Sequence, residues 1–385
     1  MSSNKPNTAP PLHRGYIEGY YGRLLSWDER RHILETLSRL GMSTYLYAPK
    51  EDPCHRLHWR KPWDRNWEEA FSKLAGTADD LGLHLIAGIA PGLDFDFSSF
   101  TGNGEDLNLL CQKARRLKNL GASSIMLLMD DIDADFQQRS GHFSTEGQAH
   151  ATLANAISDS IGEGISLTPR IYADEIQDHA EGYLEAMLDA LDSQHLITWC
   201  GAYIVDPEPG LEHSGLGQFE LPPERVIFWD NLYANDYCPR QFWLGPWQGR
   251  ENIRQIMLNP TGLPSTDRLL LAMMAAGPDR NQWTDALHDH GVPEEFLILA
   301  SFFNLPPDPR KTPDETPLDP TRIPAWLDAL DALLWKWKSP LAREWYPYLM
   351  ALRGDLLRLK GDMNDLRIRK IYPPALEANV RSAER

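Results

Sequence analysis

The sequence predicts a (β/α)8 barrel followed by a small all-α unit at the C-terminus. From Gly15 to about Gly277, short apolar runs alternate with amphipathic helical stretches. Eight such units in roughly 270 residues are typical of this barrel. The apolar runs are nearly continuous, as expected for parallel strands buried on both faces. A doubly wound open sheet is the alternative, but no G-x-G-x-x-G motif follows the first predicted strand.

The eight predicted strands are short and rich in aliphatic and aromatic residues. The last of them, RLLLAMMAA, has a pattern that suits a helix equally well. The strands are expected to begin at Gly15, Ser43, His84, Ser123, Ile165, Leu196, Arg225 and Arg268.

The segments between the strands carry helix start and stop signals. Ser26 followed by Glu29 is a capping-box pattern, and Gly41 suits the position just after a helix end. Further helices are expected to begin near Asn66, Asp106, Glu146, Asp178 and Arg250.

The predicted organisation has four parts. The parts are a disordered tail (1–12), the catalytic barrel (13–300), a proline-rich linker (301–324) and the C-terminal helical unit (325–385).

Tryptophans at positions 326, 335, 337 and 345 belong either to the core of the helical unit or to a dimer face, so a homodimer through these helices is one expected partnership.

Composition argues against several classes of partner. The formal net charge of −17 disfavours nucleic acid and anionic membranes, which both need a basic surface. The sequence contains no run of about 18 apolar residues, so no membrane span is predicted. The N-terminus lacks an apolar signal segment, and the four cysteines are scattered as ordinary reduced thiols usually are. We therefore expect a cytoplasmic protein without membrane or nucleic-acid partners.

Polar side chains follow many of the predicted strands, at the end of the barrel where active sites lie. Carboxylates, amides and aromatic rings predominate, with one lysine, as in sites that bind carbohydrate. The relevant segments are 18–23, 47–52, 91–94, 130–133, 172, 229–231 and 235–236.

Asp130 and Asp131 directly follow the apolar run IMLLM. Neighbouring negative charges repel, so one of the two is expected to hold its proton near neutrality, as a general acid must. Successive strand residues face opposite ways, which predicts different tasks for the two carboxylates. The alternative is a structural one, in which these aspartates cap the following helix.

Neither a metal nor a cofactor is expected. His55 and His58 lie near Asp52 but have no evident third ligand, and they are interpreted as loop histidines. Cys200 has no histidine partner in the sequence around it and is interpreted as a buried structural thiol.

Five segments resemble glycoside hydrolase family 84, the O-GlcNAcases and related bacterial enzymes that remove β-linked N-acetylglucosamine (GlcNAc) with retention. The two longest segments are the most specific. In chain order they are GYIEGYYGR, TYLYAPKEDPCHRLHWR, APGLDFDFS, LLMDDID and WDNLYANDYCPRQFWLGPWQGR.

This resemblance implies substrate-assisted catalysis, in which the 2-acetamido oxygen of the sugar attacks the anomeric carbon and forms an oxazoline. It further implies that Asp130 holds the acetamido N–H and that Asp131 is the general acid and base.

The same resemblance implies the residues that bind the sugar. Tyr172, Trp229 and Asn231 are expected around the acetamido group. Asp236 is expected at O4 and O6, and the remaining contacts are Asn259 at another hydroxyl, with Lys50 and the backbone of Gly19 near O3.

The function expected from the resemblance is hydrolysis of terminal β-linked GlcNAc from a glycoprotein or glycan, with Ser/Thr O-GlcNAc as the first hypothesis. A hydrolase of another GlcNAc-containing glycan and a non-catalytic glycan-binding scaffold are the alternatives. The chain departs from the family pattern at Leu24–Leu25, Arg170–Ile171 and Cys200, and the positions around Tyr172 border the expected sugar site.

Overall fold

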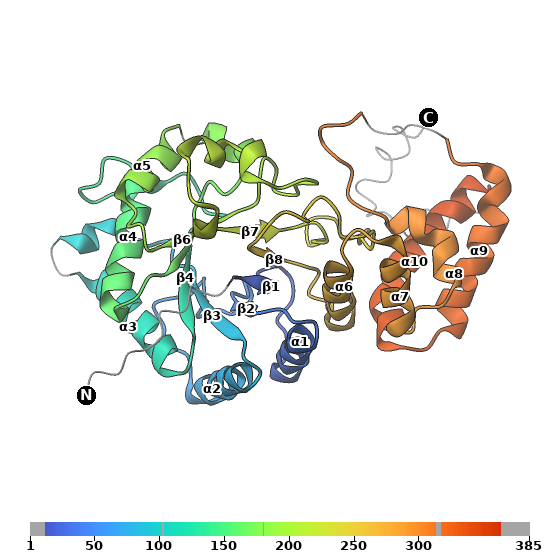
Figure 1. The fold of residues 1–385 in the computed structure, drawn as a ribbon, viewed down its shortest axis with the longest axis horizontal. Helices are drawn as coiled ribbons and strands as arrows, with labels where there is room; N and C mark the ends of the chain where they lie inside the picture. Colours follow the sequence, from blue (N-terminus) through green and yellow to red (C-terminus); the bar gives the residue numbers. More distant parts are fainter. Residues whose placement is uncertain (1–11, 102–103, 180, 313–316, 363–385) are drawn as a thin grey trace.

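The computed structural model describes residues 12–101, 104–179, 181–312 and 317–362. Its eight parallel strands form one closed barrel in sequential order, which confirms the predicted fold class (Figure 1). Most of the predicted tail and residues 363–385 lie outside the described residues. The strands are β1 (Arg14–Glu18), β2 (Thr44–Tyr47), β3 (His84–Ile89), β4 (Ser124–Leu128), β5 (Ser166–Thr168), β6 (Leu196–Trp199), β7 (Val226–Asp230) and β8 (Ile256–Leu258).

Helices cover the outside of the barrel. The first begins with the predicted capping box: the Ser26 hydroxyl accepts from the Glu29 N–H at 3.3 Å, and the Ser26 N–H donates to the Glu29 carboxylate at 2.7 Å. The surrounding helices are α1 (Trp27–Arg39), α2 (Arg65–Asp80), α3 (Glu105–Asn119), α4 (Glu146–Ile161), α5 (Tyr183–Ala190) and α6 (Pro264–Ala276).

The predicted eighth strand is wrong, because the run from Arg268 lies inside α6. The predicted helix near Arg250 is wrong too, since this segment leads into β8 as a loop. The reason is tertiary: the Arg250 guanidinium is buried against the Asp230 carboxylate at 2.9 Å. A strand of only three residues leaves almost no periodicity to detect. The helix expected near Asp178 also begins later, at Tyr183.

Residues alternate strictly between the barrel interior and the helix layer. One apolar cluster fills the interior and a larger one packs between strands and helices. On β1, Ile17 faces the interior, whereas the buried Glu18 carboxylate pairs with Arg30 of α1 at 2.7 Å. The interior residues include Ile17, Leu46, Ala48, Ile86, Ala90, Met126, Leu128, Cys200, Ile227, Trp229 and Met257.

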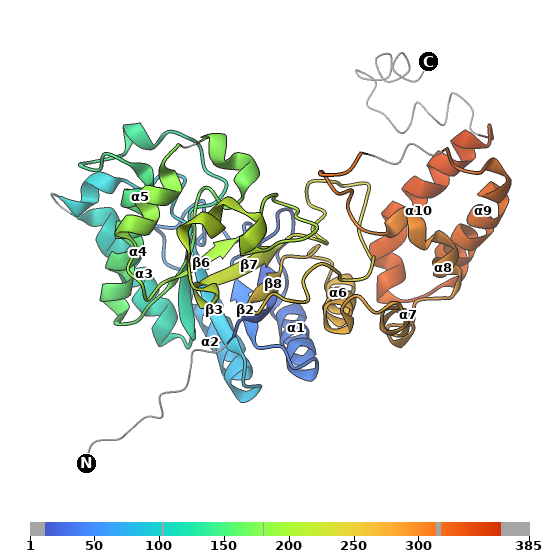
Figure 2. The same ribbon diagram turned by 45° about the horizontal axis from the view of Figure 1, so that its top comes forward.

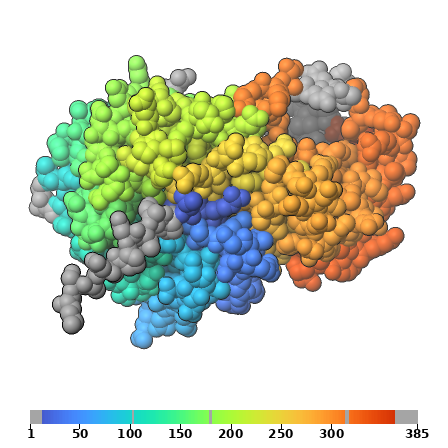
Figure 3. Space-filling view, in the orientation of Figure 1, coloured from blue at the N-terminus to red at the C-terminus, as the bar shows by residue number. Residues whose placement is uncertain are grey.

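Four more helices form a body beside the barrel: α7 (Arg280–Asp289), α8 (Glu295–Leu299), α9 (Ile323–Asp331) and α10 (Pro340–Leu359). Figures 2 and 3 show this body packed against one side of the barrel, next to α6. Although the predicted boundary at residue 300 assigns α7 and α8 to the barrel, α8 packs against α9. We therefore propose that the helical body includes α8, and that α7, which packs against α6, connects it to the barrel.

The helical body has its own apolar core and is hydrogen-bonded to the barrel. Trp326 and Trp345 are buried in it, while Trp335 is 49% exposed. The Glu344 carboxylate of α10 accepts from the backbone N–H groups of Ser265 and Thr266, at 2.9 and 2.7 Å. These bonds satisfy donors at the start of α6 and tie the two bodies together. Among the described helices, none has the length and apolarity needed to span a bilayer.

Replacing Arg250 with Met would test the buried pair that directs the chain into β8. The substitution keeps much of the volume but leaves Asp230 buried without its cation, so we expect the free energy of unfolding to fall by about 3–5 kcal/mol. The matched control is Arg254→Met, which removes an exposed pair with Glu224 and should cost about 0.5 kcal/mol or less. Urea unfolding measures both, and equal losses would contradict the assignment.

Candidate active site

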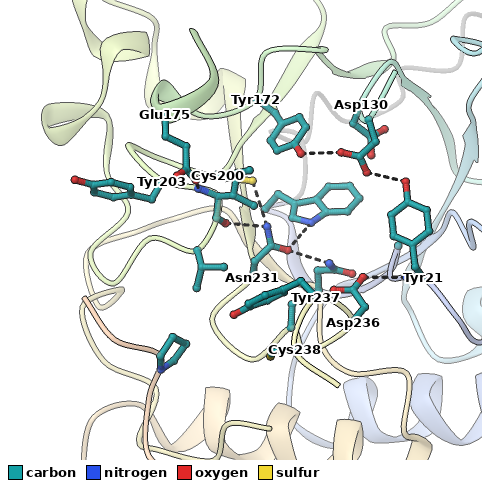
Figure 4. Close-up of a pocket in the computed structure, with 18 of the residues that line it drawn as sticks. Tyr21, Asp130, Tyr172, Glu175, Cys200, Tyr203, Asn231, Asp236, Tyr237 and Cys238 are labelled. Atoms are coloured by element: carbon teal, nitrogen blue, oxygen red, sulfur yellow. Dashed lines mark hydrogen bonds between the residues drawn. The ribbon is translucent and has the colours of Figure 1, made fainter. Parts of the chain in front are cut away.

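A cavity of about 1010 Å³ opens at the carboxyl ends of the strands (Figure 4). Its walls come from loops that follow most of the strands, as the barrel topology predicts. The structure brings all nine predicted site residues to this one cavity: Gly19, Lys50, Asp130, Asp131, Tyr172, Trp229, Asn231, Asp236 and Asn259.

Asp130 is buried at the floor of the cavity, and its two carboxylate oxygens differ in their hydrogen-bond partners. Oδ2 pairs with the ammonium of Lys50, whose side chain is also buried. Oδ1 is buried and has no hydrogen-bond partner among the described residues. A buried carboxylate oxygen without a donor carries a desolvation cost that a ligand N–H can offset. Asp130 is therefore prepared to accept one hydrogen bond from a bound molecule.

Asp131 faces the cavity because its backbone departs from the strand pattern. Its φ of 52° lies in the left-handed region, which turns the side chain out of the outward-facing position that alternation would give it. The carboxylate is 34% exposed. Its two oxygens accept from the hydroxyls of Tyr172 at 2.7 Å and Tyr21 at 2.9 Å. The Lys50 ammonium lies 3.8 Å away.

Arg56 holds the backbone of this pair in place. Its guanidinium donates to the carbonyl of Asp130 at 3.1 Å and to the carbonyl of Asp131 at 2.6 Å. These two hydrogen bonds offset the free-energy cost of the left-handed backbone at Asp131, which is on the order of 1 kcal/mol. The role of Arg56 was missed at the sequence level, although the residue lies in the segment TYLYAPKEDPCHRLHWR that carries the resemblance.

The predicted acetamido pocket contains a chain of side-chain hydrogen bonds. The Asn231 carbonyl oxygen accepts from the Trp229 indole N–H at 3.0 Å and from the Asn259 amide at 2.9 Å. The Asn231 amide donates to the carbonyl of Ile204 at 2.9 Å. The Asn259 oxygen is buried and lacks a partner among the described residues, so it is a second free acceptor.

Gly19 and Asp236 border the same pocket. A Cβ at Gly19 would lie 2.6 Å from the Trp229 ring, so only glycine leaves room for this indole. The Asp236 carboxylate is exposed and accepts from the backbone N–H of Tyr21 at 3.0 Å. Tyr21 therefore connects Asp236 with Asp131, which its hydroxyl contacts. Sequence reasoning placed Tyr21 at a strand end but gave it no role.

Electrostatics keeps the groups around the aspartates protonated. Burial and the Asp131 carboxylate raise the pKa of both Tyr21 and Tyr172, so each hydroxyl stays a donor. Burial also raises the pKa of the Cys200 thiol well above its usual value, which agrees with a structural thiol. Burial lowers the pKa of His55 to about 3, and this neutral ring bonds to the Gly88 carbonyl. The described residues contain no acidic, histidine and cysteine cluster suited to a metal.

The departures from the family pattern leave Tyr172 at the cavity. The Arg170 guanidinium turns away to form two bonds with Glu146, at 2.7 and 2.6 Å, and Ile171 is buried. Other lining residues were not predicted. Thr168 and Thr198 could have been found from strand alternation, whereas Tyr203 and Pro306 lie on loops without a sequence signal.

Comparison with known proteins decides the family. Residues 14–284 match the family model described as beta-N-acetylglucosaminidase. The chain belongs to the β-N-acetylglucosaminidase family. This assignment agrees with the resemblance seen in its sequence.

Known proteins resemble this chain in sequence and in fold. The chain is 29% identical over 257 residues to the protein O-GlcNAcases of Rattus norvegicus and Mus musculus. The match covers 64% of this chain and 28% of each relative, so the chain spans under a third of their length. A solved O-GlcNAc hydrolase mutant of Thermobaculum terrenum shares the fold, with a TM-score of 0.72 at 21% identity, over 93% of this chain and 86% of that chain.

Replacing Tyr21 with Phe would remove one of the two hydroxyl donors to Asp131. The Asp131 carboxylate then loses one of the two hydroxyls that hold it at the cavity, so its position becomes less defined. We expect kcat/KM on 4-methylumbelliferyl β-GlcNAc to fall by about tenfold. Tyr346→Phe is the control, because this tyrosine is similarly exposed (45% against 44%) and lies on α10. A kcat/KM of Tyr21→Phe equal to that of the parent enzyme would refute the role of Tyr21.

Proposed function

We propose that this chain is a retaining β-N-acetylglucosaminidase that works by substrate-assisted catalysis. The observation that carries the proposal is the pair of adjacent aspartates with different surroundings. Asp130 is buried and has one oxygen free to accept a hydrogen bond, while Asp131 is partly exposed at the cavity. The first suits a group that positions the acetamido N–H, and the second suits a group that exchanges protons with substrate and water.

The proposed reaction has two steps. In the first, the acetamido oxygen attacks the anomeric carbon, the bond to the leaving oxygen breaks, and Asp131 gives that oxygen its proton. Asp130 accepts from the acetamido N–H, which orients the amide and stabilises the positive charge of the forming oxazoline. In the second, Asp131 removes a proton from water, whose oxygen attacks the same carbon and reopens the ring. Each step inverts the configuration at the anomeric carbon, so the two steps together retain it.

In this proposal the rest of the cavity holds the sugar. Tyr172 and Trp229 enclose the acetamido group, and the hydrogen-bonded Asn231 keeps the indole in place. Asp236 binds O4 and O6, and the free oxygen of Asn259 accepts from another hydroxyl. Lys50 and the backbone of Gly19 complete the site near O3, in addition to the pairing of Lys50 with Asp130.

The proposed substrate is β-linked GlcNAc on Ser or Thr of proteins. Similarity to proteins named protein O-GlcNAcase supports this choice. The four cysteines are free, which is in keeping with a cytoplasmic location. Homodimerisation through the C-terminal helices stays a prediction. Its candidate contacts are the exposed Trp335 and Tyr346, whose rings meet edge to face at 6.4 Å, and sedimentation of the intact chain would test it.

Replacing Asp131 with Asn would remove the acid and base but keep the shape of the side chain. We expect kcat/KM on a Ser-linked GlcNAc peptide to fall by about 10²–10⁴-fold, because its alkoxide leaving group needs a proton. The first step for a 2,4-dinitrophenyl glycoside should be much less affected, since that leaving group departs as an anion. Equal losses on both substrates would contradict the assignment of Asp131.

Inhibition provides an independent check of the oxazoline. A GlcNAc-thiazoline, which copies the bicyclic intermediate, should compete with substrate for the parent enzyme. Asp130→Asn should weaken this inhibition, because the site loses its charged acceptor for the ring nitrogen. A thiazoline that binds no better than free GlcNAc would argue for a different mechanism.

A further inference from the structure

One fully buried carboxylate outside the cavity has no part in the proposed reaction. It belongs to Asp267 in the first turn of α6, and none of its surface is exposed. Asp267 does not line the cavity. Burying a carboxylate costs free energy unless hydrogen bonds offset its desolvation, so the groups that it binds indicate its role.

The Asp267 carboxylate binds the loop that follows β8. Its Oδ1 accepts from the Thr261 N–H at 3.0 Å and from the Thr261 hydroxyl at 2.6 Å. Its Oδ2 accepts from the Gly262 N–H at 3.1 Å. This loop begins at Asn259, whose side chain lines the cavity and has a free acceptor oxygen among the described residues. The three bonds therefore fix the backbone two residues beyond a proposed sugar contact.

The same carboxylate also binds the end of β1. The Tyr16 hydroxyl donates to Oδ2 of Asp267 at 2.8 Å. Because Tyr16 uses its only hydroxyl proton in this bond, the Tyr20 hydroxyl, 2.8 Å away, donates to Tyr16. Both tyrosines are buried. Tyr20 lies between Gly19 and Tyr21, which both line the cavity, so the chain of bonds reaches the β1 side of the site.

The two loops also meet directly at Gly262. Its φ of 71° lies in the left-handed region, and a Cβ at this position would lie 2.4 Å from the Tyr20 ring. Glycine is therefore required where the β8 loop passes this ring. Since Oδ2 of Asp267 binds both Gly262 and Tyr16, one oxygen holds both sides of the contact.

The helical body fixes the start of α6, which carries Asp267. Figures 1 and 2 show α6 between the barrel and the helical body. The Glu344 carboxylate of α10 accepts from the N–H and from the hydroxyl of Thr266, both at 2.7 Å. The Trp345 indole N–H donates to the same hydroxyl at 2.9 Å. The residue before Asp267 is thus anchored to α10, which gives Asp267 a fixed position.

We propose that Asp267 is a positioning residue for sugar binding, which sets the distance between Gly19 on the β1 side and Asn259 on the β8 side. It acts through the two loops that it joins and does not touch the substrate. The inference rests on the proposed hydrolase function and adds to it a residue outside the cavity. Small displacements of groups that hold a substrate are enough to slow a reaction by one or two orders of magnitude.

The experiment measures kcat/KM on 4-nitrophenyl β-GlcNAc and on its 3-deoxy, 4-deoxy and 6-deoxy analogues. Asp267→Asn keeps the shape of the side chain but turns one acceptor oxygen into an amide that faces existing donors. We expect a loss of about tenfold on the full substrate and a clearly smaller loss on at least one analogue. A hydroxyl that the substrate lacks cannot report a displaced partner, whereas partial unfolding lowers all four rates by the same factor.

Tyr16→Phe tests the connection to β1 separately. It removes the hydroxyl that joins Tyr20 to Asp267 and leaves the bonds to Thr261 and Gly262 in place. We expect a loss of about fivefold on the full substrate, as for one buried hydrogen bond, and again a smaller loss on at least one analogue. This variant decides the question if Asp267→Asn does not fold.

Asp106→Asn is the matched control. Asp106 is likewise a buried aspartate in the first turn of a barrel helix, α3. Its carboxylate accepts from the Arg60 guanidinium at 2.7 and 2.6 Å and from the Asp96 N–H at 2.9 Å. None of these residues lines the cavity. We expect this variant to lose stability in urea and to keep the kcat/KM of the parent enzyme on all four substrates.

The outcomes separate the two proposals. A parent enzyme that does not turn over 4-nitrophenyl β-GlcNAc would overturn the hydrolase function on which this inference depends. Turnover by the parent enzyme, with losses for Asp267→Asn and Tyr16→Phe that are equal on all four substrates, would overturn the positioning role alone. Parent-like kcat/KM values for the variants would overturn it too.

Discussion

The closed barrel of parallel strands forces every second residue inward, and this alternation places the active site. Ile17, Leu46, Met126, Ile227 and Met257 lie in the interior cluster. Continuing each inward series by two or four residues leads past the strand end and into the cavity. The residues reached in this way are Gly19, Lys50, Asp130, Trp229, Asn231 and Asn259. The outward series supplies buried ion pairs instead, as Glu18 and Asp230 show.

Asp131 is the exception, and the site depends on it. Alternation alone would point its carboxylate toward the helix layer, but the left-handed backbone turns it to the cavity beside Asp130. The guanidinium of Arg56 holds both carbonyls, and two tyrosine hydroxyls hold the carboxylate. Local strain at Asp131 is thus compensated by hydrogen bonds from three separate loops.

The helical body contributes to the site through the loop that joins it to the barrel. Glu344 and the α6 terminus fix the body against the barrel, while Arg310 and the loop 241–245 fix residues 306–309 beside the cavity. The buried pair of Arg250 and Asp230 connects these features, since it orders the strand end, the approach to β8 and the β6 loop at once. The shape of the cavity and the stability of the barrel are therefore coupled in this region.

The sequence by itself determined the fold class, seven of the eight strands and nine residues that line one cavity. These follow from local information: apolar runs, capping signals and segments that resemble a known family. Tertiary structure decided where β8 lies, because a three-residue strand has no period and Arg250 is placed by a partner 20 positions away. It also decided that Arg56 and Tyr21 hold the aspartate pair and that the prolines of 306–309 line the cavity. Their roles depend on hydrogen bonds and packing between distant loops, which no local pattern encodes.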